Sequence, residues 1–345
     1  MAAENLQWSL PVPSVQELVL QQIQTVPPRY IRDDLFIYPS DDHHSPRPRV
    51  PLIDMTKLVN PDSQSSELQK LHSACKDWGL FQLINHGVSD VSLRNMKEQT
   101  QEFFQLPLEE KKRWAQKPGS LEGYGQAFVT SEQQKLDWND MIFLKALPIQ
   151  NRNFEFWPKK PQNSDIRQVA VSITKFMAKG LELSDQTEEF YQGYQQGTFD
   201  VRLNCYPPCL QPERVIGMIP HADMSGITFL LDVDDTPGLQ ILKDGQWVFV
   251  EPIDGAIVVN IGQIVEIMSN GVYKAPDHRA VVNKSKERLS VVTFCYPNSS
   301  VKISPAKELV ESGNKPLYKT LTLAEYFECF YNRKLEVSFI DSLKI

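Results

Sequence analysis

The chain has 345 residues, of which 41% are hydrophobic and 23% are charged, proportions that are ordinary for a globular protein. Its net charge of -7 comes without a basic stripe, so we expect no nucleic-acid partner. No run of about 18 apolar residues occurs, and the N-terminus lacks a basic start followed by an apolar run, so neither a membrane span nor a secretory signal is expected.

The five cysteines are scattered along the chain and form neither a disulfide framework nor a zinc motif. Reduced thiols are typical of the cytosol, so we predict a cytoplasmic protein. The length fits one large domain or two small ones. We expect a monomer, although the sequence carries no direct signal of the oligomeric state.

The first half of the chain reads mostly as helices. The clearest is predicted to begin with Ser66 as its N-cap, because Leu68, Leu71 and Cys75 follow helical spacing. A polar, Pro-rich stretch at 39–48 is expected to be an exposed loop. Helices are predicted over 13–24, 66–80, 91–104, 108–114 and 165–183, and strands over 50–55 and 81–85.

Short apolar and β-branched runs separated by turn formers characterise the chain after residue 198. Many short strands at this spacing predict a β-sandwich or barrel. We therefore divide the chain into a mostly helical region, 1–197, a β core, 198–300, and a C-terminal helical extension, 301–345. Strands are predicted over 199–203, 227–231, 239–242, 247–250, 256–261, 280–282 and 289–294.

His221, Asp223 and His278 form a candidate metal site inside this β core. Side chains at positions i and i+2 of a strand point to the same face, so His221 and Asp223 can converge on one ion. Two imidazoles and one carboxylate on one face of an octahedral ion are the ligand set of non-haem Fe(II) oxygenases. We therefore predict an Fe(II) centre with open positions for a cosubstrate and dioxygen.

Arg288 and Ser290 follow ten residues after the second histidine, on one face of a predicted strand that also carries Phe294. A buried guanidinium needs an anion, which could be a protein carboxylate or the carboxylate of a bound organic acid. The earlier strand places Arg202, Asn204 and Tyr206 on one face in the same way. The phenol and the amide could hydrogen-bond a small dicarboxylate.

These motifs together resemble the plant 2-oxoglutarate/Fe(II)-dependent dioxygenases, and most closely their branch of senescence-related and codeine/thebaine demethylase-like proteins. The resemblance also covers Trp78 to Gly87 and Gly123 to Gln126. It implies a double-stranded β-helix (a jelly roll) buttressed by helices. It also implies Fe(II) on His221, Asp223 and His278.

The resemblance further implies that 2-oxoglutarate is held by Arg288 and Ser290 with help from Tyr206 and Asn204, and that assays need ascorbate. It implies a structural role for His86. Two positions depart from the family. Cys205 stands where the family usually has Tyr, and alternation points it away from the pocket. Gln263 stands where the family often has Asp, which puts local packing or a hydrogen bond near the metal in doubt.

The substrate is expected to be a small planar aromatic molecule, with a flavonoid or an alkaloid favoured. Apolar and aromatic side chains typically line such sites, and Arg202 could meet an acidic or phenolic group. Two other functions remain open. One is a non-catalytic, metal-containing binding protein, and the other is a zinc hydrolase. The predicted substrate contacts are Phe294, Tyr124, Phe143, Met141, Tyr296 and Arg202.

Overall fold

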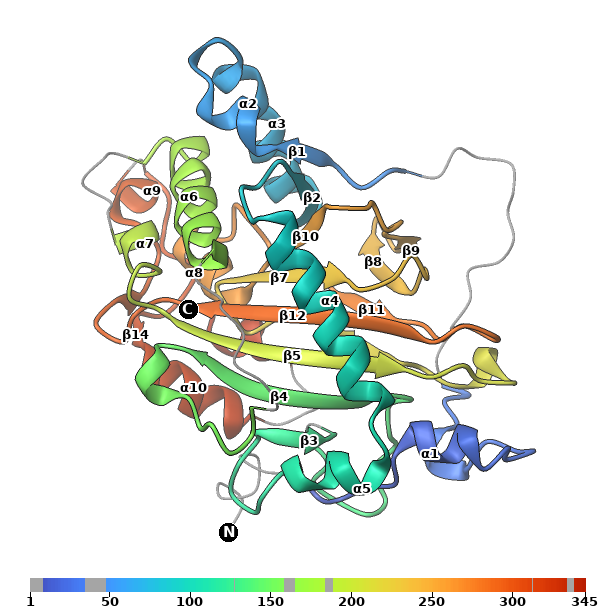
Figure 1. Cartoon of the computed structure of the whole chain (residues 1–345). Coiled ribbons are helices and arrows are strands. Elements are labelled where there is room, and N and C mark those ends of the chain that lie inside the picture. The colour runs from blue at the N-terminus through green and yellow to red at the C-terminus, as the bar shows by residue number, and fades with distance from the viewer. Residues whose placement is uncertain are drawn as a thin grey trace.

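Two β-sheets form the centre of the molecule in a computed structural model that describes residues 9–34, 48–126, 128–157, 165–183, 189–311, 313–333 and 338–345. The large sheet has the strand order β1-β2-β10-β7-β12-β5-β4-β3 (Figure 1). Its strands are β1 (Leu52–Asp54), β2 (Leu80–Ile84), β10 (Ile257–Ile261), β7 (Ile227–Asp232), β12 (Arg288–Tyr296), β5 (Thr198–Tyr206), β4 (Asp140–Leu147) and β3 (Gly123–Gly125).

The small sheet has the order β6-β11-β8-β9 and faces the large one. Apolar side chains from both sheets form a common buried cluster, including Leu230 and Val292 from the large sheet and Leu239 and Ile241 from the small one. This packing makes the space between the sheets the interior of the β core. The small sheet contains β6 (Met218–His221), β11 (His278–Ala280), β8 (Leu239–Lys243) and β9 (Gln246–Phe249).

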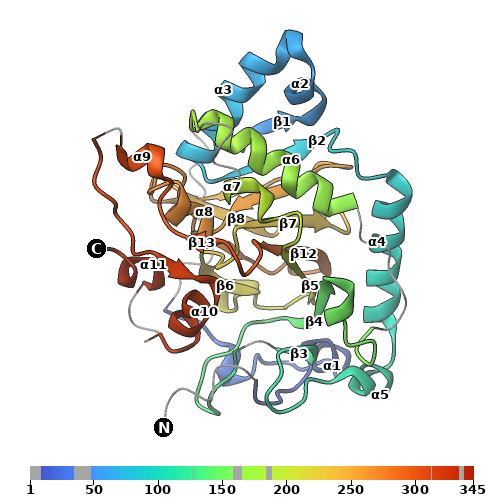
Figure 2. The same cartoon turned by 90° about the vertical axis from the view of Figure 1, so that its left-hand side faces the viewer.

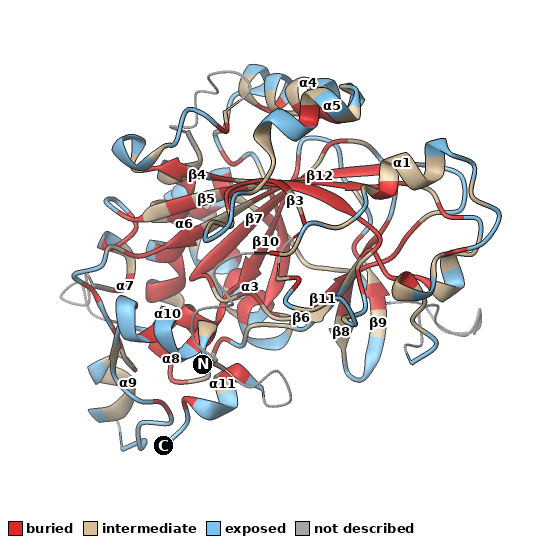
Figure 3. Ribbon diagram, turned by 90° about the horizontal axis from the view of Figure 1, so that it is seen from below, coloured by how far each residue is buried: buried red, intermediate tan, exposed pale blue. Residues whose placement is uncertain are grey.

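Helices cover the other face of the large sheet. Phe81, Phe229 and Val259 from neighbouring strands belong to the main buried cluster, together with Phe103 of α4 and Ile173 of α6. Figures 1 and 2 show α4 crossing this sheet, and Figure 3 shows that the strands are buried while much of the surface of α4 is exposed. The predicted β core flanked by helices is thus confirmed. The helices here are α3 (Pro61–Asp77), α4 (Asp90–Gln105) and α6 (Asp165–Gly180).

Several predicted boundaries are wrong. Helix α3 begins at Pro61, and the side chain of Asn60 accepts a hydrogen bond from the Asp62 amide, so Ser66 lies inside the helix and is not its cap. A proline at the first helical position was the overlooked signal. The first helix, α1 (Val15–Leu20), is shorter than predicted, and most of the expected loop at 39–48 lies outside the described residues.

Strands β3 and β4 were not predicted. The sequence of β4, DMIFLKAL, is rich in residues that favour helices, yet it pairs with β5 along most of its length. Tertiary pairing therefore decides the conformation of this segment. Because β4 and β5 lie on either side of residue 197, the division of the chain there stays a prediction.

The C-terminal residues form short helices that pack beside the loop 222–226 between β6 and β7, which carries Asp223 and is called the metal-site loop below. Helix α10 begins with a capping box between Thr322 and Glu325, and the Tyr326 hydroxyl donates to the Met224 carbonyl at 2.8 Å. The centre of its ring lies 5.3 Å from that of Phe339 of α11. Figure 2 shows α10 and α11 close together near the C-terminus. The elements of this region are β13 (Lys302–Ile303), α9 (Lys307–Glu311), β14 (Leu321–Thr322), α10 (Leu323–Tyr331) and α11 (Phe339–Ser342).

The remaining helices are short. They are α2 (Met55–Val59), α5 (Leu108–Lys111), α7 (Glu189–Gln192) and α8 (Gln263–Met268). Within the described ranges, every helix is too short or too polar to cross a lipid bilayer.

Candidate functional site

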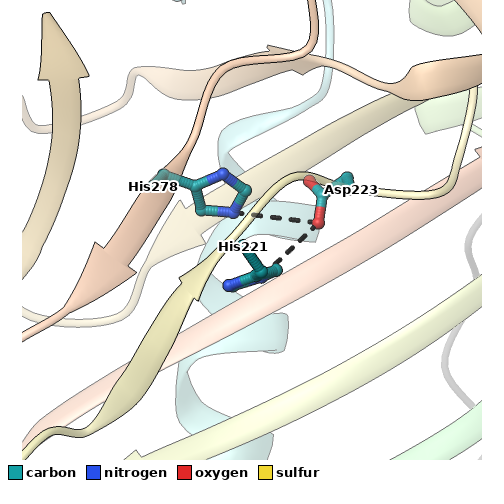
Figure 4. A group of neighbouring side chains, drawn as sticks. All are labelled: His221, Asp223 and His278. Atoms are coloured by element: carbon teal, nitrogen blue, oxygen red, sulfur yellow. Dashed lines mark ion pairs between the residues drawn. The ribbon is translucent and has the colours of Figure 1, made fainter. Parts of the chain in front are cut away.

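His221, Asp223 and His278 converge at the edge where β6 and β11 pair (Figure 4). The Nε2 atoms of His221 and His278 each lie 3.7 Å from Oδ1 of Asp223, and the candidate ligand atoms all lie within 4.8 Å of one another. Two atoms bonded to one ion at about 2.1 Å can be no more than about 4.2 Å apart. Both nitrogen–oxygen distances therefore fit ligation of a common metal ion.

The backbone conformation that brings His221 and Asp223 together differs from the predicted one. His221 is the last residue of β6, and Asp223 lies in the loop that follows, so strand alternation does not bring the two together. Backbone bonds hold the loop in place: the Gln263 amide donates to the Asp223 carbonyl at 2.8 Å. The side chain of Asn260 donates to Oδ2 of Asp223 at 3.5 Å and leaves Oδ1 for the histidines.

The two imidazole rings are oriented by main-chain carbonyls. Nδ1 of His221 lies 2.8 Å from the Ile219 carbonyl, and Nδ1 of His278 lies 3.2 Å from the Pro276 carbonyl. A carbonyl only accepts, so each Nδ1 carries the hydrogen and each Nε2 presents a lone pair. Burial, followed by the neighbouring His278, lowers the pKa of His221 to about 4. The ring is therefore neutral at physiological pH, as metal ligation requires.

A glycine packs the metal-site loop against the start of α8. A Cβ at Gly262 would lie 2.0 Å from the Ser225 carbonyl oxygen, two residues beyond Asp223. We expect Gly262→Ala to lower the free energy of unfolding by about 1–3 kcal/mol and to weaken metal binding, because the loop must move to make room. Urea unfolding and metal titration of this variant would measure both effects, and wild-type values for both would contradict this account of the loop.

Arg288, Ser290, Tyr206 and Asn204 lie together on the inner face of the large sheet. Arg288 is paired with Tyr206 across β12 and β5, and Ser290 with Asn204. The Asn204 amide donates to the Ser290 hydroxyl at 3.3 Å, and the guanidinium lies 5.4 Å from the centre of the Tyr206 ring. The four side chains predicted to hold a dicarboxylate therefore share one patch.

The guanidinium of Arg288 has a protein partner and a spare donor. Its Nη2 donates to Oδ1 of Asp232 at 2.6 Å. One edge of the guanidinium is therefore paired with a protein carboxylate, which is one of the two anions that the sequence allowed. Its Nε is buried without a hydrogen-bond partner among the described residues, as is Oδ1 of Asn204. Such unpaired buried groups are costly. An organic carboxylate bound here would supply an acceptor for the spare Arg288 donor.

Most of the predicted substrate contacts lie on the same inner face, further along the strands. Phe143 is paired with Arg202, and Met141 with Asn204, while Phe294 stands in register with Asp200. Tyr296, at the end of β12, is buried, and its ring contacts Phe327 of α10 at 5.3 Å.

Tyr124 does not belong to this set, and its prediction as a substrate contact is wrong. It is paired with Ile142, so it faces the helices and not the interior. Its ring contacts Phe103 at 6.0 Å, and its hydroxyl donates to the Ser14 hydroxyl at 3.2 Å. The error arose because β3 and β4 were not recognised as strands, so the orientation of their side chains could not be assigned.

Three further residues near the site were missed. Asp232 holds Arg288, and Asp200 lies next to Phe294 on the inner face. Asp137 is half-buried near Arg202, and desolvation, partly offset by Arg202, raises its pKa to about 6. Asp137 also takes a hydrogen bond from the Ile219 backbone, and the carbonyl of Ile219 faces His221. In the sequence these three carboxylates resemble any other acidic residue, because only strand register places them.

Other residues noted in the sequence lie outside the site. Cys205 is buried on the helix-facing side of β5, where its thiol donates to Oε2 of Glu287 at 3.1 Å, so its predicted direction is confirmed. His86 contacts the Gly255 carbonyl and the Val88 amide. Gln263 keeps a backbone bond to the metal-site loop, although its buried Oε1 has no partner among the described residues.

Comparisons with known proteins agree with this geometry. Residues 50–160 match the family model described as non-haem dioxygenase in morphine synthesis, N-terminal, and residues 198–297 match that of the 2OG-Fe(II) oxygenase superfamily. Protein SRG1 of Arabidopsis thaliana is 43% identical over 98% of this chain and 98% of its own length. Oxoglutarate-dependent flavonoid 7-O-demethylase 1 of Ocimum basilicum is 42% identical over 98% of this chain and 92% of its own.

Among solved structures, the crystal structure of JOX2 in complex with 2OG, Fe and JA superposes with a TM-score of 0.84. It is 31% identical in sequence, and the match covers 98% of this chain and 99% of that one. This likeness confirms the predicted jelly-roll fold, here with two sheets that are not closed into a barrel.

Proposed function

Because the chain belongs to the plant 2-oxoglutarate/Fe(II)-dependent dioxygenases, we propose that it oxidises a small aromatic plant metabolite, by hydroxylation or O-demethylation, and releases succinate and carbon dioxide. The observation that carries the proposal is that two groups of side chains, a candidate metal site and a candidate carboxylate site, lie inside the same β core. A cluster of two imidazoles and a carboxylate lies in the β core, and the inner face of the large sheet carries a buried arginine with a spare donor.

We assign the residues as follows. His221, Asp223 and His278 hold the iron through two Nε2 atoms and one carboxylate oxygen. Arg288 and Ser290 bind the far carboxylate of 2-oxoglutarate. When bound, iron and 2-oxoglutarate supply oxidative decarboxylation of the cosubstrate and attack on a substrate C–H bond.

Around these groups the chain orients the reactants. Tyr206 and Asn204 flank the Arg288–Ser290 pair and complete the cosubstrate contacts. Asp232 fixes the guanidinium, so the spare Nε donor is preset toward its ligand. The rigid sheet then sets which C–H bond faces the metal, and a misplacement of about 1 Å can cost about 100-fold in rate.

The substrate side of the pocket supports an aromatic molecule. Phe294, Phe143 and Met141 share the inner face and offer apolar surface to a planar ring system. Arg202 is the register partner of Phe143, and its Nε is buried without a partner in the described ranges. An acidic or phenolic oxygen of the substrate would satisfy it. The flavonoid 7-O-demethylase of Ocimum basilicum is a relative whose name fits such a substrate.

The proposal includes a monomer in the cytoplasm, without nucleic-acid or membrane partners. All five cysteines are free, which suits a reducing compartment. The acidic balance of 43 acidic to 36 basic residues disfavours a polyanionic partner.

The test is substrate-dependent turnover by the purified chain with Fe(II), 2-oxoglutarate, dioxygen and ascorbate. We expect a panel of flavonoids, alkaloids and plant extracts to include compounds that raise succinate formation above the basal rate. Mass spectrometry should find products that gain one oxygen or lose one CH₂ unit. Omission of 2-oxoglutarate is the control. Iron binding without succinate from any compound would favour the alternative, a non-catalytic metal-containing binding protein.

A further inference from the structure

We propose that Asp200 recognises a protonated amine of the substrate, so that this chain acts on a nitrogen-containing aromatic compound. The inference rests on the proposed function and narrows its substrate class. It is based on the position of the carboxylate, its missing partner and the aromatic rings around it.

Asp200 lies on the inner face of β5, on the same strand as the proposed cosubstrate contacts Asn204 and Tyr206. Side chains two residues apart share a face of a strand, so Asp200 follows Tyr206, Asn204 and Arg202 along that face. Each step of two residues covers about 6.6–6.8 Å. The carboxylate therefore lies roughly 20 Å along the strand from the cosubstrate contact Tyr206, on the part of the inner face that carries the proposed substrate contact Phe294.

The carboxylate of Asp200 lacks a partner. Its Oδ1 is buried and accepts no hydrogen bond within the part of the chain that the structure describes. Lys145 stands opposite it on β4 but is exposed, and no ion pair joins the two among the described residues. Asp200 as a whole is partly buried, but its Oδ1 atom is shielded from solvent and has no donor among the described residues. Such an oxygen is costly, since neither water nor a donor compensates it. A ligand that carries the missing donor would recover that cost.

Aromatic side chains surround this carboxylate. Phe294 is its register partner on β12. After burial, the Asp200 charge is the next cause that raises the pKa of both Tyr296 and Tyr331, so the carboxylate lies near both phenols. The ring of Phe327 lies 5.3 Å from Tyr296 and 6.4 Å from Tyr331.

This combination favours an ammonium group over a hydroxyl. An anion with ring faces beside it binds an alkylated ammonium through charge, a hydrogen bond and cation–π contacts. A hydroxyl would use only the hydrogen bond. The spare donor of Arg202, two residues away, would meet an oxygen on the other side of the same substrate.

The protonation state of Asp200 gives the binding a characteristic pH dependence. Burial raises its pKa to about 7, with Lys145 opposing and Glu122 adding to the shift. The carboxylate is therefore mostly neutral at pH 6 and mostly ionised at pH 8, whereas an aliphatic amine stays protonated over this range. Binding of the amine should tighten about tenfold between these values. The other titratable groups near Asp200 are Tyr296 and Cys295 on β12 and Tyr331 on α10.

The experiment compares two probes of one shape, an N-methylated benzyltetrahydroisoquinoline, which is protonated near neutral pH, and its N-formyl amide, which is neutral. Their affinities are measured by calorimetry for the full chain loaded with iron and 2-oxoglutarate in the absence of dioxygen. We expect the wild type to bind the amine at least about tenfold more tightly than the amide. Asp200→Asn should remove that preference and the pH dependence, while binding of the amide stays unchanged.

Two controls make the result specific. Asp254→Asn removes an exposed carboxylate that forms an ion pair with Lys97, and it should keep the preference for the amine. Asp200→Asn should not lower the melting temperature, because it removes a buried charge. An equal loss of affinity for both probes in Asp200→Asn, or equal affinity of the wild type for the amine and the amide, would overturn the inference. The slow formation of succinate without substrate, measured on the same protein preparations after dioxygen is admitted, reports separately whether the proposed function holds.

Discussion

Replacement of Asp223 by alanine should reduce substrate-dependent succinate formation to the level measured without enzyme. Asp223 is the only carboxylate in the described cluster, and its Oδ1 faces both histidine nitrogens at 3.7 Å. Without it, two imidazoles remain, and the site loses the carboxylate charge that helps to hold a divalent ion. Iron content by elemental analysis and succinate by mass spectrometry would measure the two losses together.

The fold should survive this change. Among the described residues, the side chain of Asp223 has one weak hydrogen bond, from Asn260 at 3.5 Å, whereas the loop is held by backbone bonds that alanine retains. We therefore expect a melting temperature for the metal-free protein within a few degrees of the wild type. Asp235→Ala, which removes an exposed carboxylate, is the matched control and should keep full activity. Iron bound at wild-type stoichiometry by Asp223→Ala would remove this residue from the ligand set.

The second large effect is expected at Arg288. Arg288→Lys keeps the charge but replaces a planar fork, fixed by Asp232, with a single ammonium group. One charge-assisted hydrogen bond is worth about 1.5–3 kcal/mol, so the affinity for 2-oxoglutarate should fall by about 10- to 100-fold. Titration of the iron-loaded protein with 2-oxoglutarate in the absence of dioxygen would measure the change.

The loss of affinity in Arg288→Lys should be selective for 2-oxoglutarate. Binding of the aromatic substrate and of iron should change much less, because neither contacts the guanidinium in the proposed arrangement. Arg214→Lys, at a half-exposed arginine paired with Asp33, is the control and should leave all three affinities unchanged. If Arg288→Lys bound 2-oxoglutarate as tightly as the wild type, the buried Arg288–Asp232 pair would be only structural.

The sequence alone predicted those site residues whose side-chain type by itself indicates a chemical role. His221, Asp223 and His278 were found because their residue types and spacing are rare outside metal sites. Arg288 was found because a basic residue opening a β-branched strand needs an anion. The loop that brings Asp223 to the cluster was not predicted, since backbone bonds from Gln263 position it.

What the sequence could not predict is which strands are neighbours. Tyr124 was placed in the pocket because the β3–β4 pair, which turns it outward, was not recognised. Asp232 and Asp200 were overlooked, because a role can be assigned to an acidic residue in a strand only when its partner on the neighbouring strand is known. The contact of Tyr326 with the metal-site loop joins positions 102 residues apart, which no local pattern reveals.

The most direct test of the whole account is a crystal structure of the chain grown without dioxygen in the presence of Fe(II) and 2-oxoglutarate, with anomalous data collected at the iron edge. The account predicts one strong iron peak bonded to Nε2 of His221, Nε2 of His278 and a carboxylate oxygen of Asp223. It also predicts that the far carboxylate of 2-oxoglutarate contacts Arg288 and Ser290. An iron peak bonded to other residues, or 2-oxoglutarate bound away from Arg288, would contradict it.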